Sequence, residues 1–188
     1  MTSATESQFG LGILAELSRV IRSVSEANTK QFVESILLAK RIFVAGAGRS
    51  GFMSRAFAMR LMQMGFETYV VGETVTPNIA QGDLLVLGTG SGETKSLVQI
   101  AEKAKELSAS IAIVTIFPES TIGKLADTCV RIPARPKDGS DDGYKSIQPM
   151  GTLFEQSLLV FFDAAILKLM AARGTNSDTM FTRHANLE

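Results

Sequence analysis

The apolar residues of this chain gather in five short runs that are separated by longer amphipathic stretches. The runs are RIFVA from residue 41, TYVV from 68, LLVLG from 84, IAIVTI from 111 and TCVRI from 128. Short, continuously apolar runs rich in β-branched residues are typical of strands buried on both faces of a parallel sheet. Because helical stretches alternate with these runs, the pattern predicts an α/β fold, a three-layer α/β/α sandwich around a five-stranded parallel sheet.

The stretches between the runs have helical spacing. Apolar residues recur three and four positions apart over residues 14–24, which predicts an amphipathic helix near the N-terminus. Further helices are expected at 29–39, 50–64, 94–108 and 121–126. Each of the last three follows an apolar run, as the crossover helices of a parallel sheet do.

The longest helical pattern begins with TLFEQ at residue 152 and is ended by Gly174. Its apolar side is wide enough to pack on the sheet and on a second subunit. We therefore expect one domain over residues 1–188, with N-terminal helices at about 9–39, a sheet core at about 41–132, a long helix at about 152–173 and a tail at 174–188.

Composition excludes several classes of protein. Nineteen basic and nineteen acidic residues leave no net charge, so the chain lacks a field that gathers nucleic acid or an anionic membrane. No apolar run approaches the roughly 20 residues that cross a bilayer, and the N-terminus MTSATESQFG lacks a secretion signal. These features predict a cytoplasmic protein without nucleic acid or membrane partners. One cysteine, Cys129, and one histidine do not make a metal site.

The first apolar run leads into AGAGRSG, where Gly46, Gly48 and Gly51 have the spacing G-x-G-x-x-G. This spacing occurs in dinucleotide-binding loops, in which a helix N-terminus holds the pyrophosphate. Glu73 lies 22 residues after Gly51, where an acid that binds the ribose would lie. A dinucleotide site is one interpretation of this loop, and glycines that only allow a tight turn and close packing are another.

A second glycine loop, GTGSGETKS, follows the third apolar run. In a doubly wound sheet the loops after the first and third strands face each other at the topological switch point, where ligands bind. Hydroxyl groups beside the N–H groups of a helix start suit a phosphomonoester, and Arg49 adds a charge-assisted bond to phosphate or to a sugar oxygen. The expected hydroxyl groups are those of Ser50, Thr89, Ser91 and Thr94. The alternative is that Ser50 and Ser91 only cap helices.

Two further residues have a structural and a functional interpretation. The segment TLFE from Thr152 has the spacing of a capping box, in which Glu155 would only cap the long helix. Alternatively, Glu155 lies beside the pocket and removes a proton α to a carbonyl. His184, in the polar tail, is either an exposed residue without a task or a group that transfers a proton to a substrate oxygen, in its own or a neighbouring subunit's pocket.

Six segments in order along the chain resemble the sugar isomerase (SIS) domain superfamily and, within it, the 6-phospho-3-hexuloisomerases. They are AGAGRSG, FAMRLMQMGF, VGETVTP, GTGSGETKSL, IQPMGTLFEQ and HANLE. Six segments that cover nearly the whole chain are far more specific than either glycine loop. Residues 134–144 match only loosely and are given no role.

The resemblance implies a flavodoxin-like SIS domain that interconverts D-arabino-3-hexulose 6-phosphate and fructose 6-phosphate without a cofactor. This step follows the fixation of formaldehyde onto ribulose 5-phosphate by 3-hexulose-6-phosphate synthase in the ribulose monophosphate pathway, which makes that synthase a functional partner. The resemblance also implies a homo-oligomer, a tetramer, with pockets near subunit boundaries.

Carried over by position, the resemblance makes Glu155 the proton acceptor and places His184 in the matching HANLE segment. The substrate phosphate is expected at Ser50 and along the second glycine loop, at Thr89, Gly90, Ser91, Gly92, Glu93 and Thr94. By itself Glu93 is an ordinary acid of a first helical turn. A non-catalytic SIS module that senses a sugar phosphate remains an alternative, although the lack of net charge and of a helix-turn-helix argues against a DNA-binding regulator.

Overall fold

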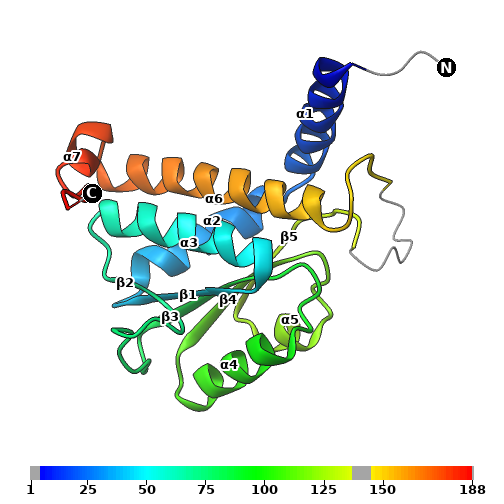
Figure 1. Cartoon of the computed structure of the whole chain (residues 1–188). Coiled ribbons are helices and arrows are strands. Elements are labelled where there is room, and N and C mark those ends of the chain that lie inside the picture. The colour runs from blue at the N-terminus through cyan, green and yellow to red at the C-terminus, as the bar shows by residue number, and fades with distance from the viewer. Residues whose placement is uncertain (1–4, 137–144, 188) are drawn as a thin grey trace.

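The structure, a computed structural model, describes residues 5–136 and 145–187, so residues 137–144 of the loosely matching stretch lie outside it. Within these residues five parallel strands form one sheet in the order β2-β1-β3-β4-β5, and Figure 1 labels them. The strands are β1 (Ile42–Gly46), β2 (Thr68–Val70), β3 (Leu84–Gly88), β4 (Ser110–Thr115) and β5 (Thr128–Arg131). This is the flavodoxin-like doubly wound order, with its switch point between β1 and β3. The predicted fold class is confirmed.

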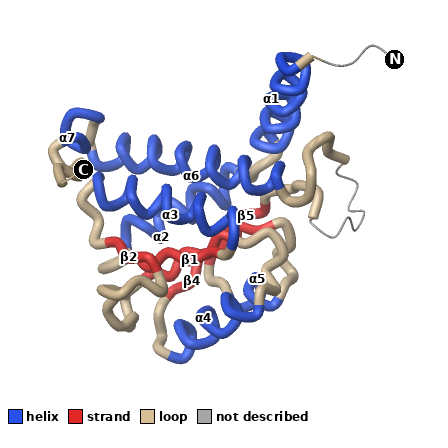
Figure 2. The backbone as a smooth tube through the Cα atoms, in the orientation of Figure 1, coloured by secondary structure: helices blue, strands red, loops and turns tan. Residues whose placement is uncertain are grey.

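Helices cover both faces of the sheet (Figure 2). They are α1 (Glu6–Arg22), α2 (Glu26–Leu38), α3 (Gly48–Gln63), α4 (Lys95–Glu106), α5 (Thr121–Leu125), α6 (Thr152–Arg173) and α7 (Ser177–Phe181). On one face Val86 of β3 belongs to a buried cluster with Phe57 of α3, and on the other Leu85 belongs to a cluster with Leu97 of α4. Consecutive residues of β3 thus serve opposite cores, as the period of a strand requires.

Helix α6 packs mainly on α3 and also contacts α1 and α2, and α2 and α3 separate most of it from the sheet (Figure 1). Phe162 of α6 stacks on Phe57 of α3, with ring centroids 4.2 Å apart. Near its start, α6 reaches the sheet, because a Cβ on Gly88 would lie only 2.9 Å from Leu158 Cδ2. The apolar side of the long helix thus packs on the sheet near its start, as expected, and mainly on other helices over the rest of its length. Its first turns alone are brought to the carboxyl end of β3, where a ligand site is expected.

The N-terminal helices begin earlier than their apolar spacing predicts, because polar caps define their starts. Thr5 and Gln8 form a capping box at α1, and the Ser25 side chain accepts the Asn28 N–H at α2. The sequence pattern also does not predict α7, a short helix that is capped by Asn176 within the expected tail. Apolar periodicity is a weak signal for such short or capped turns.

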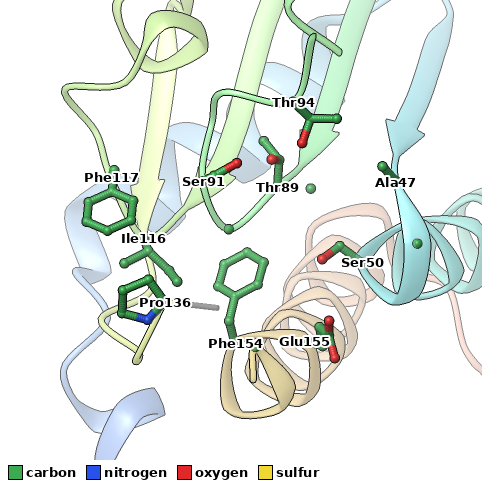
Figure 3. Close-up of a pocket in the computed structure, with 14 residues that line it drawn as sticks. Ala47, Ser50, Thr89, Ser91, Thr94, Ile116, Phe117, Pro136, Phe154 and Glu155 are labelled. Atoms are coloured by element: carbon green, nitrogen blue, oxygen red, sulfur yellow. The ribbon is translucent and has the colours of Figure 1, made fainter. Parts of the chain in front are cut away.

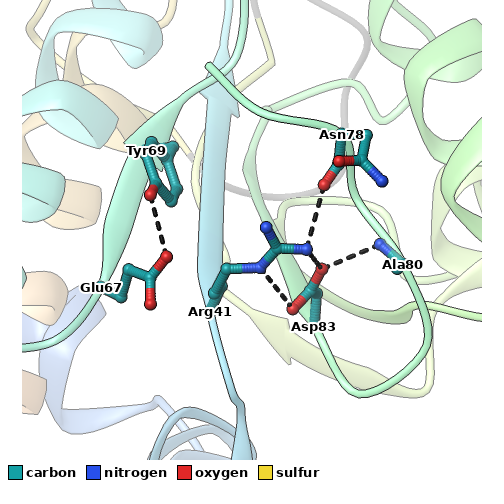
Figure 4. A network of polar contacts seen from close by, with 6 residues as sticks. All are labelled: Arg41, Glu67, Tyr69, Asn78, Ala80 and Asp83. Carbon is teal, nitrogen blue, oxygen red and sulfur yellow. Dashed lines mark hydrogen bonds and ion pairs between the residues drawn. The ribbon is translucent and has the colours of Figure 1, made fainter. Parts of the chain in front are cut away.

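A buried ion pair anchors the loop between β2 and β3 (Figure 4). Arg41 donates to both carboxylate oxygens of Asp83, from Nε at 3.1 Å and from Nη2 at 2.7 Å. The Asp83 side chain is 2% exposed and also accepts the Ala80 N–H, while Arg41 donates to the Asn78 carbonyl oxygen. Burial alone would raise the pKa of Asp83, but the bonds from Arg41 and Ala80 outweigh it and hold the pKa below its usual value of 3.8.

The substitution Asp83→Asn keeps the shape of this site and weakens its charge-assisted hydrogen bonds, so the variant should be about 2 kcal/mol less stable than the wild type. Because the folded-state pKa of Asp83 is lowered, its contribution is complete above 3.8 and is lost as the pH falls below that value. Urea denaturation should show a stability gap between the two proteins that is full at about pH 7 and narrows at about pH 3. A gap that does not change with pH would contradict this account.

Candidate functional site

A cavity of about 340 Å³ opens at the switch point between β1 and β3. Figure 3 shows the hydroxyl groups of Ser50, Thr89, Ser91 and Thr94, from the two glycine loops, around one part of it. An apolar wall stands opposite, formed by Ile116, Phe117, Pro136 and Phe154. The two glycine loops therefore line a common cavity, as their places in the sequence predict.

In the first loop, glycine is required for close packing of α3 on β1. A Cβ on Gly51 would lie 2.7 Å from the Gly46 carbonyl oxygen, and a Cβ on Gly46 would lie 2.9 Å from Gly51 Cα. This contact places the first turn of α3, with the buried Ser50, beside the cavity. Ala47 is the N-cap of α3 and makes no side-chain cap bond, so Ser50 is not a cap. Its hydroxyl makes no hydrogen bond to another described residue and lines the cavity.

The second loop is held by its own hydroxyl groups and by α5. Thr89 Oγ1 accepts the Gly92 N–H at 3.3 Å, and Ser91 Oγ accepts the Glu93 N–H at 3.2 Å. The Glu93 carboxylate accepts the N–H and the hydroxyl of Thr121 at 2.7 and 2.8 Å, and these bonds hold the pKa of Glu93 below its usual value. Gly92 and Glu93 do not line the cavity. Their hydrogen bonds instead support the loop that presents the hydroxyl groups to it.

Three helices begin at this cavity, namely α3 at Gly48, α4 after its N-cap Thr94, and α6 after its N-cap Gly151. None of the three N-caps forms a side-chain cap bond, so backbone N–H groups of the first turns remain to bind a ligand. Within the described residues no lysine or arginine lines the cavity. Helix N-termini and hydroxyl groups thus provide its anion-binding character.

Glu155 enters the cavity from the first turn of α6. Its side chain is 4% exposed, and Arg49 Nε lies 2.7 Å from Glu155 Oε2. The Arg49 side chain is 60% exposed and does not itself line the cavity. A buried carboxylate that faces the cavity, with a cation beside it at the cavity edge, is placed to act as a base.

The capping interpretations are wrong. The N-cap of α6 is Gly151, and the hydroxyl of Thr152 donates to the Pro149 carbonyl oxygen at 2.7 Å instead of capping the helix. Thr152 and Glu155 therefore form no capping box. Ser91 does not cap α4 either, because the N-cap of that helix is Thr94.

His184 lies away from Glu155 within the same chain. It lines a second hollow with Arg60, Asp163 and Met170, and its ring stacks on Phe181 with centroids 5.9 Å apart. Since Met170 is about 22 Å along α6 from Glu155, the two predicted catalytic side chains do not meet in one protomer. A role for His184 in catalysis requires the pocket of a neighbouring subunit.

Glu73 does not serve the cavity as a ribose-binding acid would. Its carboxylate forms an ion pair with Arg55, and both side chains are about half exposed. Glu73 is not among the residues that line the cavity. The glycine spacing of the first loop is thus explained by the packing of α3 on β1.

The residues of the apolar wall carry no motif that predicts their place at the cavity. Ile116 and Phe117 follow β4, which pairs with β3, so the strand order could have predicted that they lie near the cavity. Pro136, from beyond β5, had no such signal. The described residues contain no group of three or more His, Cys, Asp or Glu placed to bind a metal ion. None of their helices is long and apolar enough to cross a membrane.

Comparison with known proteins agrees with this fold. Residues 35–160 match the SIS domain, and the chain belongs to the SIS domain family. The resemblance drawn from the six sequence segments is therefore confirmed.

Individual proteins are similar to this chain over nearly its whole length. The chain is 56% identical to the 3-hexulose-6-phosphate isomerase of Bacillus subtilis (strain 168), over 94% of this chain and 95% of the relative. It is 41% identical to the 3-hexulose-6-phosphate isomerase of Mycobacterium gastri, over the full length of both proteins. A solved structure of a hypothetical protein from Methanococcus jannaschii, for which the function of 3-hexulose-6-phosphate isomerase was inferred, has a TM-score of 0.84 and 31% identity over 96% of this chain and 99% of that chain.

Proposed function

We propose that this chain is an isomerase that interconverts D-arabino-3-hexulose 6-phosphate and fructose 6-phosphate without a cofactor. The observation that carries the proposal is the joining, in one cavity, of the buried Glu155 carboxylate and hydroxyl-lined helix starts suited to a phosphate. The names of the relatives in Bacillus subtilis and Mycobacterium gastri support the same substrate.

The phosphate of the substrate binds between the two glycine loops. Ser50, Thr89, Ser91 and Thr94 donate hydroxyl hydrogen bonds, and the first N–H groups of α3 and α4 add backbone donors. Gly90 allows the loop to pass close to Phe154, since a Cβ there would lie 3.3 Å from that ring. Anchoring the phosphate fixes C2 and C3 of the sugar relative to Glu155, which makes proton transfer an intramolecular event.

The reaction moves the carbonyl from C3 to C2. Glu155 takes the proton from C2, the electrons form a cis-enediolate, and Glu155 returns the proton to C3 on the same face. The proton of the C2 hydroxyl group passes to the oxygen at C3 in the same interval, so the enzyme ends in its starting state. Because the O6 atom of the 3-ketose carries the phosphate, the substrate cannot close a ring onto it, and no ring-opening acid is obligatory.

Arg49 and His184 are proposed to steady the oxygens at C2 and C3. The Arg49 guanidinium lies beside Glu155, where negative charge develops on the enediolate, and a preorganised cation there lowers the barrier. His184 is proposed to act in a neighbouring subunit's site, since it lies beside the second hollow of its own chain.

We also propose that the protein is a cytoplasmic homotetramer that acts on the product of 3-hexulose-6-phosphate synthase. Phe9, Leu11 and Leu14 of α1 are exposed apolar side chains, which suits contacts between subunits. Neither a nucleic acid nor a membrane is proposed as a partner, because the sequence carries no net charge.

A coupled assay tests the proposal. The synthase, ribulose 5-phosphate and formaldehyde supply the substrate, and fructose 6-phosphate should accumulate only when this chain is added. A well-folded preparation that yields no fructose 6-phosphate would refute the activity. Tight binding of the hexulose phosphate without turnover would indicate a sensing module instead, and a change in NAD(P)H fluorescence on titration would indicate a dinucleotide site.

A further inference from the structure

Helix α1 holds the segment that leads into α6 through one carboxylate. Glu16 Oε1 accepts the Ile147 N–H at 2.8 Å, and Glu16 Oε2 accepts the Ser146 hydroxyl at 2.8 Å and Gln148 Nε2 at 3.0 Å. In Figure 1 the blue α1 stands beside the yellow chain that enters α6. Burial alone would raise the pKa of Glu16, but these three bonds and the charge of Arg19 outweigh it and hold the pKa below its usual value.

The same face of α1 fits this segment on either side of Glu16. A Cβ on Gly12, one turn earlier, would lie 2.7 Å from Ile147 Cδ1, so glycine admits the isoleucine side chain. Arg19 Nη2, one turn later, donates to the Lys145 carbonyl oxygen at 3.2 Å. Residues spaced by three and four positions share a face of a helix. Three successive turns of α1 therefore hold residues 145–148. These residues begin the stretch 145–151 that leads into α6, called the entry segment below.

The entry segment forms part of the cavity wall and starts the helix that carries Glu155. Met150 has a φ of +54°, a conformation that a non-glycine residue keeps only where its surroundings hold it. The next residue, Gly151, lines the cavity and is the N-cap of α6. The Glu155 N–H donates to the Gly151 carbonyl oxygen at 3.0 Å. One helical turn thus separates the held segment from the proposed base.

We infer that Glu16 is a positioning residue: by fixing the entry segment it sets the start of α6 and the aim of the Glu155 carboxylate. Glu16 does not line the cavity, so it acts through the chain that it holds. The inference rests on the proposed function of Glu155. The hydroxyl groups that are proposed to bind the phosphate lie on the two glycine loops, not on α6. Loss of the Glu16 contacts should therefore affect proton transfer rather than phosphate binding.

The substitution Glu16→Gln tests this inference, because it removes the charge that accepts three hydrogen bonds and sets an amide N–H group against Gln148 Nε2, which donates to Glu16 in the wild type. We expect kcat to fall about tenfold with KM changed less than about twofold, since small displacements of a base cost rate rather than affinity. The double variant Glu16→Gln, Gln148→Glu exchanges donor and acceptor across the contact and should regain most of kcat. Glu26→Gln is the matched control: Glu26 of α2 pairs with Lys168 in the far half of α6 at 2.9 Å, and its loss should leave kcat unchanged.

Amide hydrogen exchange gives a second readout that does not depend on activity. In Glu16→Gln the N–H of Ile147 and those of the first turn of α6 should exchange faster than in the wild type, and the double variant should restore their protection. If the wild type makes no fructose 6-phosphate, the proposed function fails, and exchange still decides whether Glu16 holds the start of α6. Unchanged exchange, unchanged kcat per folded molecule, or a rise in KM at constant kcat would each overturn the inference.

Discussion

Replacement of Glu155 by glutamine should lower kcat about 10³-fold while KM and the urea midpoint stay close to those of the wild type. The amide keeps the shape of the carboxylate but cannot take a proton from carbon. Among the described residues, the cation that loses its partner is that of Arg49, whose side chain is 60% exposed and can turn to water. Steady-state kinetics in the coupled assay and urea denaturation measure the two effects separately.

Glu73→Gln is the control for this substitution. It removes the acid that a dinucleotide-binding loop would need, and it breaks only a half-exposed ion pair with Arg55. Its kcat should stay within about twofold of the wild type, since exposed ion pairs contribute little. If Glu155→Gln lost its fold, or kept its activity, the carboxylate would have a structural role or none, and the proposed mechanism would fail.

The fold follows from the sequence because each strand is a short apolar run and each crossover helix has its own period. Strand order then places the loop at Gly48 opposite the loop at Ser91, so the common cavity could also be predicted. The second apolar run is the weakest of the five, and β2 is an edge strand of three residues. Its half-buried side chains leave a fainter pattern than those of the central strands.

The contacts of the charged side chains could not be predicted in the same way. Thr152 and Glu155 have the spacing of a capping box, yet the N-cap of α6 is one residue earlier, at Gly151. The segment before it is held by Glu16, which is far away in the sequence. Arg49 was expected to bind the substrate, and its contact with Glu155 depends on how α3 and α6 pack. Such contacts arise from tertiary packing, which local spacing does not encode.

The largest effect on stability is expected at Gly51. Neither Gly46 nor Gly51 has a positive φ, so space rather than backbone conformation requires glycine at both positions. The substitution Gly51→Ala would place a Cβ 2.7 Å from the Gly46 carbonyl oxygen, a backbone atom that cannot rotate away. Helix α3 must then move off β1, at a cost of about 3 kcal/mol in the free energy of unfolding.

Gly10→Ala makes the same chemical change in α1, where a Cβ would meet nothing within 4 Å. There alanine should stabilise the helix by up to about 1 kcal/mol, so urea denaturation of the two variants separates crowding from the general effect of a methyl group.

Movement of α3 also withdraws Ser50 from the cavity, so the folded fraction of Gly51→Ala should have a higher KM for the hexulose phosphate than the wild type. If Gly51→Ala were as stable as Gly10→Ala, the glycines would not be required for packing, and a direct approach of the loop backbone to the ligand would have to explain them instead.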